Sequence, residues 1–118
     1  MSSIEFRCEV KAPADSKVHT FLQYLEQCFT RRWEREEALE SIEKLGVDTA
    51  FLEDTDGSEF GYFEADEEGY VGFIIDLVPS ADIELFDDFI EVLESLDAES
   101  YNAHLFDSSS GGEQSWEK

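Results

Sequence analysis

The chain has 118 residues, of which 42% are hydrophobic and 14% aromatic, and its formal net charge is −22 at pH 7. This length and apolar content are typical of one domain with a modest core, and they exclude an acidic disordered polypeptide. The charge would repel nucleic acids and anionic membranes but attract basic proteins. Two cysteines are too few for a disulfide scaffold, and no apolar run approaches the ~18 residues of a membrane span.

The charge is distributed unevenly along the chain. The first 45 residues hold seven lysines and arginines beside nine aspartates and glutamates. Residues 46–117 hold 21 acidic residues and neither lysine nor arginine, and Lys118 is the last basic residue. Because repulsion on this scale destabilises a compact state, we expect the acidic charge to serve a basic partner or an unusual solvent.

The first predicted elements are a strand and two helices. Apolar and charged residues alternate over residues 4–11, which predicts a half-buried strand. Asp15 or Ser16 can cap a helix over 16–29, where apolar residues recur at helical spacing. A second helical pattern covers 33–45, and the two patterns are compatible with one bent helix or with a helical pair.

Three short strands are predicted in the middle of the chain. Val47–Glu53 leads to a turn with Asp-Gly at its tip, and Glu59–Glu64 returns from that turn. A second acidic turn connects this hairpin to Tyr70–Val78, in which alternate residues are apolar. We therefore expect an antiparallel meander.

A helix, a strand and a tail are predicted at the end of the chain. Residues 82–96 carry an apolar stripe at helical spacing, and Tyr101–Phe106 follows as a strand. The Ser/Gly-rich sequence after it is linker-like, so we expect a single domain over 1–107 and a disordered tail over 108–118. This order favours an α+β fold with helices on one face of an antiparallel sheet, and our first choice is a ferredoxin-like arrangement with an extra hairpin strand.

The predicted last helix carries a row of acidic residues opposite its apolar stripe. Carboxylates three or four positions apart repel one another by a few tenths of a kcal/mol, and no lysine or arginine lies nearby in the sequence. The spacing of such a row is of the same order as the rise of a nucleic acid strand, about 3.4 Å per nucleotide and its multiples. The row consists of Glu84, Asp87, Asp88, Glu91 and Glu94.

A second acidic group lies in the two predicted turns and alternates with aromatic residues. Aromatic residues often anchor protein interfaces, and we expect Tyr62 to do so here. The acidic residues that we expect to contact a basic partner with it are Glu53, Asp54, Asp56, Glu64, Asp66, Glu67 and Glu68. Asp54-x-Asp56-Gly57 resembles the start of a calcium loop but lacks the bidentate glutamate at the required offset, so we favour a hairpin turn.

No set of residues predicts catalysis or metal binding. His19 and His104 do not have a metal-ligand spacing with Cys8 or Cys28. A catalytic pair in which His104 activates Cys28 as a nucleophile is left as an open alternative, although a lone pairing of this kind is usually accidental. We therefore expect a protein that is not an enzyme and that uses no metal and no cofactor.

Over residues 4–107, the order of elements and the acidic balance resemble the regulator-of-ribonuclease-E-activity B family. The matching features are the strand–helix start, the acidic hairpin, Val71–Val78, the helix over 82–96 and a closing strand at Glu99–Asp107. The family's Asp-Gly-Trp signature near that strand is absent, and this chain has Tyr101–His104 there. The resemblance implies a small acidic ferredoxin-like protein that binds and inhibits an RNA-degrading enzyme. By charge, and without a shared motif, the chain is also similar to phage-encoded DNA mimics, including anti-restriction and anti-CRISPR proteins.

The sequence therefore favours a non-enzymatic inhibitor that binds the basic nucleic-acid-binding surface of a nuclease or CRISPR-type surveillance complex. One alternative is an immunity protein that neutralises a basic nuclease toxin. Another is a salt-adapted domain whose charge keeps it hydrated and which inhibits nothing.

We expect no direct contact with nucleic acid or membrane. The sequence leaves the oligomeric state open, and a dimer is one of the possibilities. Because the first residues lack the pattern of a secretory signal, we expect a cytoplasmic protein, in the host cell if a phage encodes it.

Overall fold

The computed structural model describes residues 4–52, 58–77, 85–108 and 111–118, with the side chain of Arg32 left out. Within these segments the order of elements is β1-α1-α2-β2-β3-α3-β4-β5, and no helix is long and apolar enough to cross a membrane. The strands are β1 Ile4–Lys11, β2 Glu59–Phe63, β3 Tyr70–Leu77, β4 Tyr101–Asp107 and β5 Gly112–Glu117. The α-helices are α1 Lys17–Thr30, α2 Arg35–Glu43 and α3 Leu85–Ser95, and two short 3₁₀ helices are η1 Arg32–Glu34 and η2 Ala50–Leu52.

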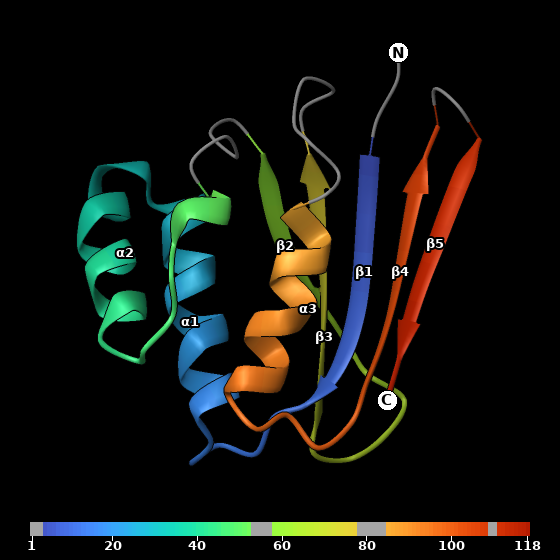
Figure 1. Cartoon of the computed structure of the whole chain (residues 1–118), viewed down its shortest axis with the longest axis horizontal. Coiled ribbons are helices and arrows are strands. Elements are labelled where there is room, and N and C mark those ends of the chain that lie inside the picture. The colour runs from blue at the N-terminus through green and yellow to red at the C-terminus, as the bar shows by residue number, and fades with distance from the viewer. Residues whose placement is uncertain (1–3, 53–57, 78–84, 109–110) are drawn as a thin grey trace.

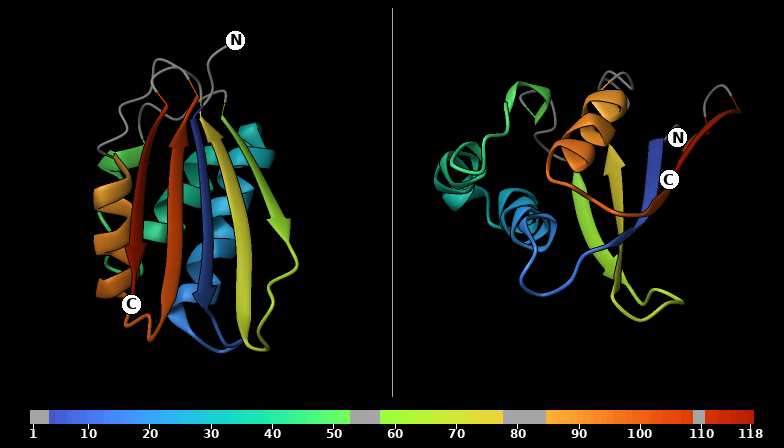
Figure 2. Two further views of the ribbon diagram at one scale, coloured as in Figure 1. Left: turned by 90° about the vertical axis from the view of Figure 1, so that its right-hand side faces the viewer. Right: turned by 60° about the horizontal axis from the view of Figure 1, so that its bottom comes forward.

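The five strands form one antiparallel sheet in the order β2-β3-β1-β4-β5. The helices cover one face of this sheet and leave the other face open (Figures 1 and 2). This arrangement confirms the predicted α+β fold class. Without β5, the strand order β2-β3-β1-β4 and the two helical crossovers are compatible with the ferredoxin-like expectation.

The boundaries of α1 and α2 agree closely with the sequence prediction, and residues 82–84 of the predicted last helix lie outside the described residues. Ser16 caps α1, since its side-chain oxygen accepts a hydrogen bond from the His19 N–H at 3.2 Å. The two helical patterns form a helical pair rather than one bent helix, because the 3₁₀ helix η1 separates α1 from α2. Gly46, two residues after the C-cap Lys44 of α2, adopts a φ of +89°, the left-handed conformation that is common just after a helix.

The additional strand is not the one that the sequence predicted. The predicted strand Val47–Glu53 is wrong over its described residues, 47–52: Asp48 Oδ1 accepts the Ala50 N–H at 3.0 Å, a local bond that starts a turn, and η2 follows. The predicted disordered tail is also wrong at Gly112–Glu117, which form β5 on the edge of the sheet. The Trp116 ring packs edge-on against Phe6 with 5.9 Å between ring centroids, and this contact anchors the strand.

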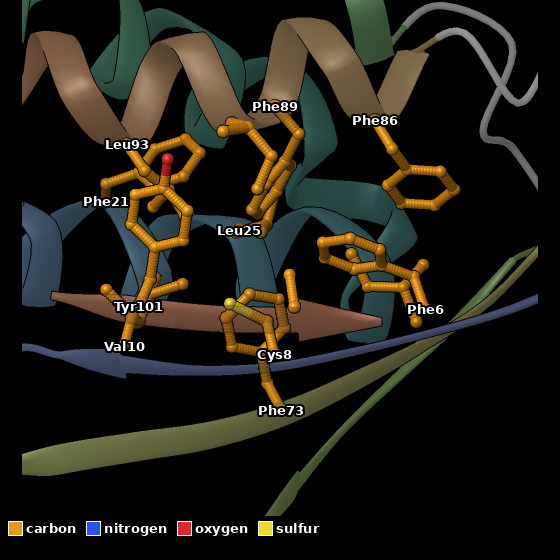
Figure 3. Close-up of a cluster of buried hydrophobic side chains, with 14 of the residues drawn as sticks. Phe6, Cys8, Val10, Phe21, Leu25, Phe73, Phe86, Phe89, Leu93 and Tyr101 are labelled. Carbon is orange, nitrogen blue, oxygen red and sulfur yellow. The ribbon is translucent and has the colours of Figure 1, made fainter. Parts of the chain in front are cut away.

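Aromatic side chains of the sheet and of α3 form the centre of the core. Phe6 of β1 is fully buried and stacks on Phe86 with a centroid distance of 4.2 Å. Its ring also lies 5.4 Å from Phe89 and 6.2 Å from Phe73. Figure 3 shows these side chains between the strands and α3. Such aromatic pairs contribute ~0.5–1.5 kcal/mol each beyond the burial of their area.

Substitution of Phe6 should destabilise the fold strongly. We expect Phe6→Ala to lower the free energy of unfolding by about 3–5 kcal/mol, because it leaves a cavity among four aromatic rings. Phe6→Leu retains more volume and should cost about 1–3 kcal/mol. Urea denaturation measures both. Phe106→Leu is the matched control, since Phe106 lies on the open face with 39% of the residue exposed and should change stability by less than ~0.5 kcal/mol. Equal losses at the two positions would contradict the assigned core.

Candidate acidic interaction surface

The amphipathic pattern of α3 places its carboxylates on the outside of the molecule. Leu85, Phe86, Phe89, Ile90 and Leu93 are buried against the core. Once this stripe is buried, the opposite side of the helix must face solvent. Four residues of the predicted acidic row are exposed there, and the fifth, Glu84, lies outside the described residues. The exposed four are Asp87, Asp88, Glu91 and Glu94.

Two of these carboxylates contact neighbouring strands. Asp87 Oδ1 lies 3.3 Å from Trp116 Nε1 and 3.4 Å from Gln114 Nε2, so both donors of β5 point to it. Glu94 Oε1 accepts a hydrogen bond from the Tyr101 hydroxyl of β4 at 2.8 Å. Burial of Tyr101, and secondly this hydrogen bond to a carboxylate, raise the pKa of Tyr101 to about 12. Asp87 and Glu94 are thus held in place along one side of the row.

The other two carboxylates border a groove between α3 and residues 46–51. The chain turns back after Gly46 and lies beside α3 (Figure 1). The groove between residues 46–51 and α3 has a volume of about 420 Å³. Asp88, Glu91 and Asp48 are exposed at this groove. Val47, Phe51 and Val92 supply apolar surface to it, so the groove combines an apolar lining with three carboxylates. We refer to it as the α3 groove.

The acidic turn between β2 and β3 lies on a different side of the molecule. Glu64, Asp66, Glu67 and Glu68 are all exposed. The turn is tied to β1, because the Ala12 N–H donates to the Gly69 carbonyl at 3.0 Å. Asp66 borders a depression on the open face of the sheet, and Figure 2 shows the turn at the sheet edge far from α3. The α3 row and this turn therefore do not form one surface. Three further predicted residues lie outside the described residues: Glu53, Asp54 and Asp56.

Tyr62 does not belong to the acidic turn either. In a strand, successive side chains point to opposite faces, so Tyr62 faces the helices while Phe63 faces the open side. The Tyr62 hydroxyl donates to the Leu22 carbonyl of α1 at 3.2 Å, and 47% of the residue remains exposed. Burial, and secondly the Glu26 carboxylate, raise the pKa of Tyr62 to about 12. Tyr62 therefore fastens β2 to α1.

The strand register produces an acidic row that the sequence reasoning missed. Asp76 of β3 lies directly opposite Glu59 of β2 and directly opposite Glu5 of β1, all on the open face. The row continues to Phe106 and Glu113 on β4 and β5. Like charges in directly opposite positions destabilise a sheet. The three members come from distant parts of the chain, so only the pairing of strands reveals them.

Ion pairs in the described part of the chain leave the α3 carboxylates uncompensated. Lys11 binds Glu99 at 2.8 Å, and Arg31 binds Glu34 at 3.4 Å. His104 lies 4.0 Å from Glu113. Among the described residues, no lysine or arginine forms an ion pair with a carboxylate of α3.

The cysteines and histidines form no reactive group in the described residues. Cys8 and Cys28 are buried, and burial raises the pKa of both thiols, which disfavours the thiolate nucleophile. Cys28 lies in the core on α1, whereas His104 lies on the open face of β4, so the sheet separates them. The pairing of these two residues that the sequence left open is thus not formed. No group of three potential metal ligands occurs in the described segments.

Comparisons with known proteins found no matching family model, no matching curated protein and no matching solved structure.

Neutralising the centre of the acidic row on the open face should stabilise the protein. We expect Asp76→Asn to raise the free energy of unfolding by about 0.5 kcal/mol at low salt, because it removes two opposed like-charge pairs. The gain should shrink near 1 M salt, where the screening length is only ~3 Å. Urea denaturation at the two salt concentrations measures both effects. Glu113→Gln is the control, because it removes one negative charge that lies opposite the uncharged Phe106. It should raise the free energy of unfolding by less. Equal increases for the two variants would show that stability depends on total charge and not on the opposed pairs.

The Glu94 carboxylate should control the ionisation of Tyr101. We expect Glu94→Gln to lower the pKa of Tyr101 part of the way from about 12 towards 10, because burial, the larger cause, remains. Since the folded value exceeds the unfolded one, Tyr101 contributes stability that is present below pH ~10 and lost as the pH rises towards 12. The titration of Tyr101 is followed by the ultraviolet absorbance of its phenolate. The measurement uses a Tyr62→Phe background, because the pKa of Tyr62 is also about 12 and its signal would overlap. Glu91→Gln borders the α3 groove and should leave Tyr101 unchanged; an equal effect would contradict the assigned contact.

Proposed function

We propose that the protein is a non-enzymatic inhibitor that binds the basic nucleic-acid-binding surface of a nuclease or surveillance complex in place of nucleic acid. One observation carries this proposal: four exposed carboxylates lie along α3, and no described lysine or arginine pairs with them. Such a row disfavours the isolated helix, so its presence needs a cause outside the stability of the fold.

The geometry of α3 suits the replacement of phosphates. One helical turn rises ~5.4 Å, and the side chains at three- and four-residue spacing stand ~5–6 Å apart. Phosphates follow one another along a nucleic acid strand with a rise of ~3.4 Å per nucleotide, so the spacings of the two rows of negative charge agree within a factor of about two. A basic groove that binds phosphates by charge would attract this helix, and the net charge of −22 would speed the encounter.

The α3 row is also held in advance of binding. Five apolar residues anchor the helix to the core, and neighbouring strands hold Asp87 and Glu94 by hydrogen bonds. Side chains that are already ordered lose less conformational entropy when a partner binds. The ordering of these carboxylates supports a binding interface more than salt adaptation. A salt-adapted surface needs hydrated charges, but it does not need them at fixed positions.

Two variants with the same loss of charge test the proposal. The α3 variant carries Asp87→Asn, Asp88→Asn, Glu91→Gln and Glu94→Gln. The turn variant carries Glu64→Gln, Asp66→Asn, Glu67→Gln and Glu68→Gln. Each immobilised protein is challenged at low salt with the heparin-binding proteins of the cells that produce the chain, and the nuclease activity of the captured protein is then measured with added inhibitor.

We expect the unmodified chain to capture a basic nucleic-acid-binding protein and to inhibit it in competition with DNA or RNA. The α3 variant should bind about a hundredfold more weakly, which corresponds to about 3 kcal/mol, while the turn variant should lose less than about threefold. Equal losses in the two variants would contradict α3 as the site. Absence of any captured protein, together with stability that rises steeply towards molar salt, would favour the salt-adapted alternative.

A further inference from the structure

The α3 groove has two kinds of surface that a single ligand must satisfy. Val47, Phe51 and Val92 present apolar surface, while Asp48, Asp88 and Glu91 present negative charge. A purely polar ligand would leave the apolar surface against water, and a purely apolar ligand would bury carboxylates without partners. The groove therefore suits a long apolar chain that ends in a cation.

We propose that the α3 groove receives an arginine side chain of the basic partner, an inference that rests on the proposed function. The aliphatic stem of arginine covers apolar surface while its charged head stays near polar groups. The guanidinium is planar, offers five donors, binds carboxylates in pairs and stacks on aromatic rings such as Phe51. The compact ammonium group of lysine has no planar surface to stack on a ring, and it cannot form paired hydrogen bonds with a carboxylate.

The groove is built in advance for such a side chain. Asp48 is held by its hydrogen bond with the Ala50 N–H at 3.0 Å, which fixes the segment opposite α3. The Phe51 ring is held edge-on against Phe89 of the core, with 6.0 Å between centroids and an interplanar angle of 79°. The volume of about 420 Å³ lies within the usual range of ligand sites, ~300–1,000 Å³.

The carboxylates around the groove favour a cation whose hydrogen-bond donors point in several directions. No lysine or arginine is among the described residues that line it. Asp48, Asp88 and Glu91 are not grouped closely enough to hold a metal ion, since no such cluster occurs in the described residues. A guanidinium reaches carboxylates on different sides because its donors are spread around a plane.

Titration with small arginine analogues tests the groove directly. The probe is N-acetyl-arginine N-methylamide, followed by the NMR signals of the Val47 and Val92 methyl groups and of the Phe51 ring. The neutral isostere N-acetyl-citrulline N-methylamide keeps the shape without the charge, and N-acetyl-lysine N-methylamide keeps the charge without the plane. We expect saturable shifts at these three residues with arginine, weaker ones with lysine, and at least about tenfold weaker binding with citrulline.

Matched variants locate the binding. Asp88→Asn with Glu91→Gln should weaken arginine binding about tenfold, while Glu67→Gln with Glu68→Gln in the distant turn should leave it unchanged. Equal binding of citrulline and arginine, shifts that do not saturate, or shifts centred elsewhere on the surface would overturn the inference.

The two proposals fail separately. If arginine does not bind the groove but the fourfold α3 variant still loses its partner, the inhibitor proposal stands and the groove assignment falls. If arginine binds the groove and that variant keeps its partner, the groove stands and the inhibitor proposal falls.

Discussion

The packing of α3 against the sheet is the constraint on which the rest of the structure depends. Phe6 of β1 stacks on Phe86 and contacts Phe89, so the central strand and α3 share one aromatic cluster. This contact fixes the rotation of α3 about its own axis, and the rotation decides which carboxylates face solvent. Trp116 joins the same cluster from β5, which extends the sheet and brings the β5 donors to Asp87. One cluster thus places both the acidic row and the strand beside it.

Electrostatic repulsion acts against this packing on both faces of the molecule. The open face of the sheet carries the row of Glu59, Asp76 and Glu5, and the helical face carries the carboxylates of α3. In the described residues the lysine and arginine ion pairs, Lys11 with Glu99 and Arg31 with Glu34, lie elsewhere. The aromatic core must offset this repulsion, and a basic partner or high salt would relieve it. The charge is therefore a property that the fold tolerates, which supports a use outside the fold.

The predicted acidic groups differ in how well their local sequence defined them. The residues of α3 share a face because the helical period relates them directly, so four of the five could be placed from the pattern alone. The turn residues are also exposed as expected, but their position relative to α3 depends on the order of strands in the sheet. Tyr62 faces the helices, and its hydroxyl bond to the Leu22 carbonyl depends on β2 lying against α1, which no pattern within β2 encodes.

The sequence by itself determined the elements whose period and caps are local: the strand Ile4–Lys11, the helix capped by Ser16, and the acidic face of α3. Tertiary structure alone decided that Gly112–Glu117 is a strand, since its pairing with β4 and the contact of Trp116 with Phe6 join residues that are distant in the chain. It also decided which carboxylates meet across strands and which border the α3 groove. The physical reason is that register and groove walls arise from contacts between separate elements, and no periodicity within one element encodes them.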